Sequence, residues 1–208
     1  YISNKGLSKQ KILENLAQIE GVYVPSLYDI KYDEKGIVST VKARTPAPVV
    51  IKKRWIKNLD NYNTESVILT PNTEFGDMFL LEISRGCGRN CRFCMAGYCY
   101  RVPRARSLEK IIERAKIGAK YKNKIGLVGA AISDYPYIDE LADALVELGI
   151  KFSVSSLRAD TLREPLMRGL SASNHKTITV APEAGSQRLR NIINKGITEE
   201  HVLNSVEL

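Results

Sequence analysis

The chain has 208 residues, of which 44% are hydrophobic and 26% are charged, and its net charge at pH 7 is +8. This composition is typical of a globular protein, and the length allows one or two domains with a sizeable core. The sequence shows no signal peptide and no long apolar run, so we expect a cytoplasmic protein without a membrane partner. Because it begins with Tyr1 and ends inside an apparent helix, we expect a piece of a longer protein.

Residues 1–77 lack a regular alternation of strands and helices, and we expect them to form a mixed α/β extension that links to the following domain. Ser8 is a typical N-cap and predicts a helix that ends at Gly21. Two short strands are predicted around a turn at residues 33–36, before the proline-bearing connector TPAPVV.

From Met78 onward the pattern changes, and residues 78–208 are predicted to form the main domain. Apolar segments alternate with amphipathic helices, which predicts an α/β fold of parallel strands joined by right-handed crossovers. The strands are expected at 78–84, 125–132, 151–156 and 177–183, and the helices at 108–122, 135–148, 160–170 and 186–194. The pattern alone does not separate an open doubly wound sheet from a barrel.

All four cysteines lie in one short basic loop, EISRGCGRNCRFCMAGYCYRVPRARS, which also contains six arginines. Clustered thiols outside a small secreted scaffold indicate a metal or redox site more often than a disulfide. Zinc commonly takes two separated cysteine pairs, and a second pair is absent here. The spacing of Cys87, Cys91 and Cys94 instead suits an iron–sulfur cluster. Three thiolates on a four-iron cluster would leave one iron open to a reactant, whereas Cys99 as fourth ligand would close it.

The segment CGRNCRFC resembles the CxxxCxxC loop of the radical S-adenosylmethionine (radical SAM) superfamily, in which an aromatic residue, here Phe93, precedes the last cysteine. The flanking residues and the later SLRAD and APEAGSQRLRNIINKGIT resemble a subgroup that often carries an upstream cobalamin-binding domain. The resemblance implies a partial TIM barrel of six strands. Only four are counted here, so we expect a truncated sheet with an exposed edge at the fourth strand, and self-association or poor order near residues 183–208.

The same resemblance implies an enzyme. Cys87, Cys91 and Cys94 would bind a [4Fe-4S] cluster, and an electron from a reductant such as a ferredoxin or flavodoxin would cleave S-adenosylmethionine (SAM). The product radical, 5′-deoxyadenosyl, would abstract hydrogen from a substrate that the sequence does not identify. Cobalamin is a candidate cofactor of the full-length protein, and the basic charge makes nucleic acid a candidate substrate.

Further SAM-binding positions follow from the resemblance at the carboxyl ends of the strands, where parallel α/β folds bind ligands. They are Phe93, Gly129, Ala130, Ser155, Arg158, Glu183 and Lys195. Gly129 and Ala130 stand where the family often has Gly-Gly-Glu, but this chain lacks the glutamate, so backbone carbonyls or Ser133 and Asp134 are candidates for its role. Glu183 matches a ribose-binding position, and Lys195 matches a position that pairs with the SAM carboxylate.

Several of these residues also have a structural interpretation, and Glu183 would be a solvated surface charge. Gly129 and Ala130 would allow tight strand–helix packing, Arg158 would pair with Asp160, and Lys195 would be a cation at a helix C-terminus. Two other functions also fit the cysteine loop: an RNA-binding module stabilised by zinc or a cluster, and an electron-transfer domain with Cys99 as the fourth ligand.

Overall fold

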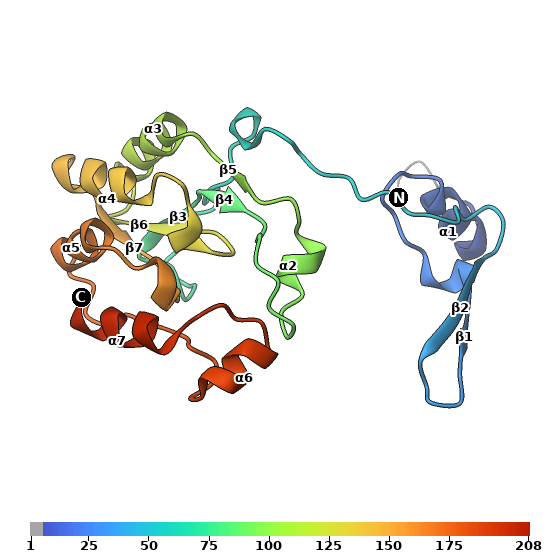
Figure 1. Ribbon diagram of the computed structural model, residues 1–208. Coiled ribbons are helices and arrows are strands. Elements are labelled where there is room, and N and C mark those ends of the chain that lie inside the picture. The colour runs from blue at the N-terminus through green and yellow to red at the C-terminus, as the bar shows by residue number, and fades with distance from the viewer. Residues whose placement is uncertain (1–5) are drawn as a thin grey trace. The chain divides into compact units, whose positions relative to one another are not determined.

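The computed structural model describes residues 6–208, and the chain divides into two compact units, Tyr1–Ile56 and Lys57–Leu208. The first unit contains a helix and a two-stranded antiparallel hairpin (Figure 1). Its elements are α1 (Lys9–Ala17), η2 (Pro25–Leu27), β1 (Tyr28–Tyr32) and β2 (Val38–Ala43).

The predicted helix cap and hairpin turn of the first unit are both confirmed, but the helix ends at Ala17 and not at Gly21. The Ser8 hydroxyl accepts a hydrogen bond from the backbone N–H of Lys11 at 3.3 Å, which satisfies one of the open donors of α1. In the turn, the Asp33 carboxylate accepts bonds from the backbone N–H groups of Lys35 and Ile37 at 2.9 and 2.8 Å. Gly36 takes a positive φ of 75°, a conformation that glycine adopts without steric cost.

The second unit is a mixed α/β structure around a three-stranded parallel sheet in the order β3-β6-β7. The sheet strands are β3 (Met78–Glu82), β6 (Lys124–Val128) and β7 (Lys151–Ser153), and the helices of its crossovers are α3 (Leu108–Gly118) and α4 (Ile138–Glu147), with α5 (Glu164–Ala172) after β7. The remaining elements are η3 (Leu59–Asn61), β4 (Ser84–Arg85), α2 (Ala96–Cys99), β5 (Arg104–Ala105), η4 (Ile132–Asp134), η5 (Ala159–Thr161), α6 (Gln187–Ile192) and α7 (Glu199–Glu207).

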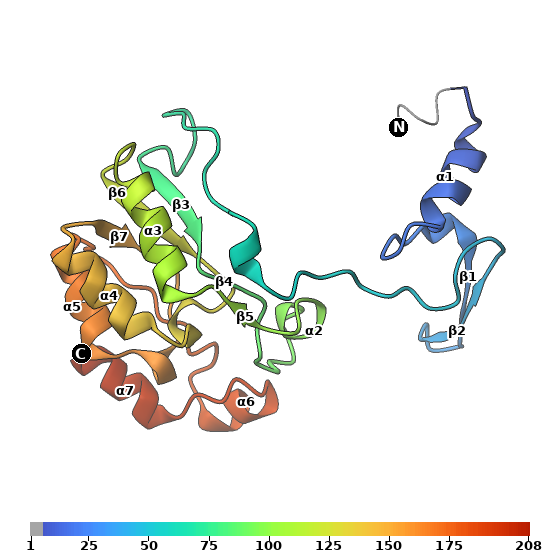
Figure 2. The same ribbon diagram turned by 90° about the horizontal axis from the view of Figure 1, so that it is seen from above.

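Helices α3, α4 and α5 lie next to one another along one side of the sheet (Figure 2). Phe79, Leu81 and Phe152 point into this core and are almost fully buried. Along β3 the burial alternates, because successive side chains of a strand point to opposite faces. The other face, which carries Met78 and Leu80, is less buried. This arrangement is consistent with part of a β/α barrel.

The prediction of a fourth parallel strand at residues 177–183 is wrong. These residues make one parallel bridge, between Leu157 and Val180, with the Leu157 N–H donating to the Thr179 carbonyl at 2.9 Å. The ladder does not extend further, because β7 ends at Ser153 and the chain after Leu157 turns into η5 at Ala159. The segment that follows, where poor order or self-association was expected, folds into α6 and α7, and Ile197 between them is fully buried.

Residues 57–77 belong to the second unit, so the boundary expected at residue 77 falls inside it. Thr64–Ser66 pairs antiparallel with the outer edge of β3: Ser66 N–H donates to the Leu80 carbonyl at 2.9 Å, and Glu82 N–H to the Thr64 carbonyl at 3.0 Å. The buried Arg106 guanidinium binds the carbonyls of Leu59, Tyr62 and Glu82 and the Glu82 carboxylate. One buried cation thereby fixes this segment against β3.

Candidate functional site

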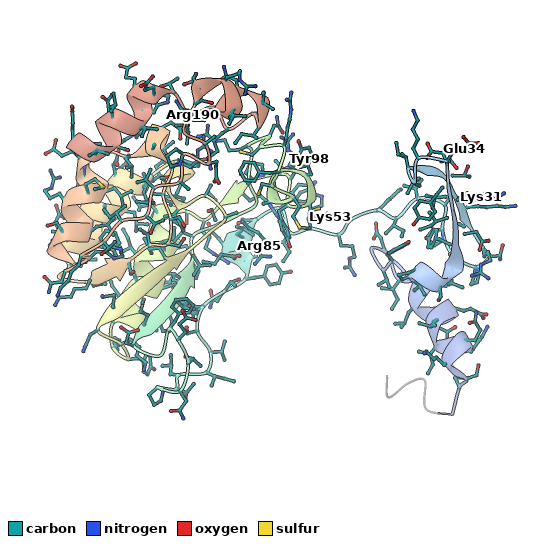
Figure 3. The ribbon with its side chains drawn as sticks, turned by 90° about the horizontal axis from the view of Figure 1, so that it is seen from below. Lys31, Glu34, Lys53, Arg85, Tyr98 and Arg190 are labelled. Carbon is teal, nitrogen blue, oxygen red and sulfur yellow. The ribbon has the colours of Figure 1, made fainter. Side chains whose placement is uncertain are left out.

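The cysteine loop leaves the carboxyl end of β3 and is closed at its base by a short antiparallel pair, β4 with β5. Figure 3 shows Arg85 at this base and Tyr98 on α2 within the loop. Two glycines permit the tight path. Gly86 has a φ of +92° and lies against the carbonyl of Tyr100, and Gly97 lies against the carbonyl of Arg89. A side chain at either position would collide with backbone.

Three of the four cysteines are shielded to some degree by this loop: Cys91 is buried, and Cys87 and Cys94 are half-buried. Cys99, at the end of α2, is exposed. The Cys94 N–H donates to the Cys91 carbonyl at 3.1 Å, which forms a turn within the CxxC segment. The backbone N–H of Arg89 donates to the Cys87 sulfur at 3.4 Å. Hydrogen bonds to sulfur of this kind tune the reduction potential of iron–sulfur clusters.

The donor set fits an iron–sulfur cluster. All four cysteines lie in the described part of the chain and carry thiols rather than disulfides. Within residues 6–208 no three His, Cys, Asp or Glu side chains converge as ligands of a single metal ion. A four-iron cluster binds each cysteine at a different iron, so its thiolates do not converge on one point. Three soft thiolates on one loop are the ligands that such a cluster requires.

Carboxylates from two strand ends hold the loop through Arg89. Its guanidinium donates to both oxygens of Asp134 in η4 at 2.9 and 2.8 Å, and to Asp160 in η5 at 3.3 Å. Burial alone would raise the pKa of Asp160, but hydrogen bonds from Arg158 and the charges of Arg158 and Arg89 outweigh it, so the pKa is lowered. Asp160 is therefore charged at neutral pH.

Arg158 makes the pair with Asp160 that its structural interpretation predicted, with Nε and Nη2 each at 2.9 Å from the carboxylate. Its Nη2 also donates to the carbonyl of Lys195 at 2.9 Å. The Lys195 ammonium lies 2.7 Å from the Glu183 carboxylate and 5.6 Å from the centre of the Phe93 ring. The structure therefore brings together four of the residues singled out from the sequence: Phe93, Arg158, Glu183 and Lys195.

The turn that carries Lys195 is itself bound to the cysteine loop. Arg92 N–H donates to the Ile193 carbonyl at 2.9 Å, and the Asn194 amide donates to the Asn90 carbonyl at 2.9 Å. Arg190, labelled in Figure 3, is 3% exposed and binds the carbonyls of Ala184, Gly185 and Ile197. It holds the chain on both sides of α6 in one compact turn.

Gly129 and Ser155 line a different space, a cavity of about 310 Å³ on the less buried face of the sheet. Its walls are mainly apolar and include Met78, Leu80 and Val128. Ala130 is exposed, and none of the contacts described above places it with the other candidates. A second cavity, of about 240 Å³, is bounded by Cys87 and Asp134. The second cavity lies beyond the carboxyl ends of β3 and β6, the usual ligand-binding edge, whereas the first runs along the sheet face from Met78 to Gly129 and Ser155.

Sequence reasoning gave Arg89 no role of its own, although its position inside the CxxxCxxC segment was visible. Asp134 was noted only as a substitute for a missing glutamate, and Asp160 only as a partner of Arg158. The available signal was that each acidic residue follows a predicted strand of the parallel sheet.

The family model of the radical SAM superfamily matches residues 81–208, from the last residues of β3 to the end of α7. The chain belongs to the radical SAM superfamily. This confirms the resemblance carried by the cysteine loop. Members of this superfamily typically use a [4Fe-4S] cluster and SAM, and this radical SAM chain has the three-cysteine loop that fits such a cluster.

A relative extends the likeness beyond the family model. The radical SAM chain is 41% identical over 199 residues to MJ0966, an uncharacterized protein of Methanocaldococcus jannaschii. The match covers 93% of this chain and 43% of the relative, so the chain spans less than half of that protein's length.

Every helix among residues 6–208 is too short or too polar to cross a lipid bilayer.

Proposed function

We propose that this chain is the core of a radical SAM enzyme, with a [4Fe-4S] cluster held by Cys87, Cys91 and Cys94 and one iron left open for SAM. The observation that carries the proposal is the placement of a three-thiol loop at the carboxyl end of β3, bound to side chains that follow β6 and β7. The three strands would form part of the partial TIM barrel of the superfamily.

The residues around the loop supply groups suited to SAM. Lys195 offers a cation for the carboxylate, and Glu183 offers acceptors for the ribose hydroxyls. Phe93 presents a half-exposed ring beside them, and Gly129 and Ser155 line the open face of the sheet. Arg158 would act indirectly, because it holds Asp160 and the backbone of Lys195.

When bound and reduced, the cluster supplies the electron that cleaves SAM to methionine and a 5′-deoxyadenosyl radical, which takes hydrogen from the substrate. The protein would orient SAM and keep water from the site. We propose a ferredoxin or flavodoxin as reductant. Cobalamin as a further cofactor and nucleic acid as a substrate remain proposals for the whole protein; the net charge of +8 supports the latter.

The first prediction separates the enzyme from an electron carrier. Replacing Cys87, Cys91 or Cys94 by alanine in the whole protein should abolish four-iron incorporation on anaerobic reconstitution, because each thiolate holds one iron. Cys99→Ala is the matched control from the same loop, and it should retain a cluster whose EPR spectrum changes when SAM is added. Loss of the cluster in Cys99→Ala would favour the electron-transfer function. One tightly bound zinc per chain without a response to SAM would favour the RNA-binding module.

A further inference from the structure

Arg89 is the one arginine within the CxxxCxxC segment whose described hydrogen bonds reach side chains after both β6 and β7. It donates to both oxygens of Asp134 at 2.8 and 2.9 Å and to Asp160 at 3.3 Å. Those partners lie 45 and 71 residues away along the chain. The planar guanidinium can hold one carboxylate in a bidentate pair and reach a second one, which an ammonium group cannot do with the same geometry.

The charges of Arg89 and its ion-pair neighbours balance. Asp134 and Asp160 contribute two negative charges, and Arg89 and Arg158 contribute two positive ones, joined by ion pairs of 2.8 to 3.3 Å. The Asp160 side chain is only 9% exposed, so solvent screens it poorly. The backbone N–H of the same Arg89 contacts the Cys87 sulfur, and Asp134 and Cys87 border one cavity. A change in this balance would therefore act close to a cluster ligand.

We propose that Arg89 is a positioning residue with two effects. Its bidentate pair fixes the cysteine loop to the ends of the parallel strands, and its charge shields an anionic cluster from the two carboxylates. The inference rests on the proposed function, because it takes Cys87 as a cluster ligand. Partners that orient metal ligands commonly affect metal affinity by about 10- to 100-fold when they are mutated.

The test compares Arg89→Met with Arg85→Met in the whole, anaerobically reconstituted protein. Arg85 is a matched control: it also lies in the loop, its side chain is 36% exposed against 37% for Arg89, and it makes a bidentate pair, with Glu82 at 2.8 Å. That pair is local, three residues away, and Glu82 keeps Arg106 as a partner when Arg85 is lost.

Two measurements that do not depend on activity are made on each variant. Iron release to a ferrous chelator should be faster in Arg89→Met, by up to about 100-fold, and near the wild-type rate in Arg85→Met. The cluster midpoint potential, followed by EPR, should become more negative in Arg89→Met, because the unshielded carboxylates oppose the added electron. The double variant Arg89→Met/Asp134→Asn should recover the potential but not the iron retention. Arg89→Lys should largely keep the midpoint potential of the cluster, but it should release iron faster than the wild type.

If Arg89→Met does not fold by circular dichroism, Asp134→Asn carries the test, because it leaves both arginines in place. It should raise the potential and speed iron release. The inference would be overturned if Arg89→Met and Arg85→Met had the same iron-release rate and midpoint potential, or if Asp134→Asn matched the wild type in both. Either result would leave the proposed function standing. A wild-type protein that takes up no four-iron cluster would overturn both.

Discussion

At the residue scale, Lys195 and Glu183 form the pair to which the proposed function assigns SAM binding. The Lys195 side chain is only 9% exposed, and its ammonium is satisfied by Glu183 at 2.7 Å and by the face of Phe93. The proposed enzyme would use the two charges for different parts of one ligand, the carboxylate and the ribose of SAM. SAM binding would then replace the ion pair between Lys195 and Glu183 by a contact from Lys195 to the SAM carboxylate and one from Glu183 to the ribose.

The prediction for Glu183 follows from this exchange. Hydrogen bonds to a charged group typically contribute about 1.5–3 kcal/mol, so Glu183→Ala should weaken SAM binding by roughly 10- to 150-fold. Iron content should not change, because Glu183 is not a proposed cluster ligand. Calorimetric or EPR titration of SAM against the reconstituted cluster measures the effect. Glu147→Ala, an exposed carboxylate on α4, is the control and should leave SAM affinity unaltered. Equal affinities in the two variants would return Glu183 to a purely structural role.

At the element scale, the edge of β3 depends on one carboxylate. Glu82 ends the strand and accepts hydrogen bonds from Arg85 at 2.8 Å and from the buried Arg106 at 2.9 Å. Burial by itself would raise the pKa of Glu82, but the two arginines outweigh burial and lower it below its ordinary value of 4.5. A group with a lowered folded-state pKa stabilises the fold above its unfolded pKa, and this stabilisation is lost as pH falls through the folded pKa.

Glu82→Gln should therefore lower the free energy of unfolding at pH 7 by about 1.5–3 kcal/mol, the usual contribution of hydrogen bonds to a charged group. The difference from wild type should shrink as the pH falls from 4.5 through the lowered folded-state pKa of Glu82, where the folded wild-type carboxylate becomes protonated. Denaturant unfolding between pH 7 and pH 3 measures this. Asp143→Asn, which breaks an exposed pair with Arg168, should show a much smaller change. If the difference in free energy of unfolding between the wild type and Glu82→Gln did not change with pH, the stabilising role of the charged Glu82 would be contradicted.

Particular elements show which parts of the fold could be predicted from the sequence and which could not. The Ser8 cap and the Asp33–Gly36 turn depend on neighbouring residues, so local patterns were sufficient. The segment TITV has the β-branched residues of a strand, yet a strand also needs a partner, and β7 ends at Ser153. The antiparallel addition of Thr64–Ser66 to β3 was likewise invisible, because polar residues of an edge segment carry no strong periodicity.

The candidate site also has one part that could be predicted from the sequence and another that could not. The cysteine spacing is a local signal, and it was enough to identify the family. The pair of Lys195 with Glu183 and the two carboxylates on Arg89 join residues from 12 to 71 positions apart. The crossover connections of the parallel sheet bring Arg89 to its two carboxylates, and the compact turn around α6 brings Lys195 to Glu183. A single sequence therefore names these residues as candidates but does not indicate which of them pair.

At the scale of the whole molecule, the division into two units has a direct consequence. The segment between β2 and η3 contains no regular secondary structure, and Lys52, Lys53 and Arg54 within it are exposed. The second unit begins at Lys57 and contains all four cysteines and the whole family match. Loop segments with exposed basic residues are the preferred sites of tryptic cleavage.

We predict that brief trypsin treatment of this 208-residue chain cuts first after Lys52, Lys53 or Arg54, where no strand or helix hydrogen bonds must be broken. The fragment that starts at residues 53–55 should keep the far-ultraviolet circular dichroism of the second unit and unfold cooperatively, because Arg106 and β3 hold residues 59–66 within it. Mass spectrometry identifies the cut. Lys52→Gln/Lys53→Gln/Arg54→Gln is the control and should lose this early cleavage. A first cut inside residues 64–82 would instead show that the edge segment on β3 opens before the connection between the two units is cleaved.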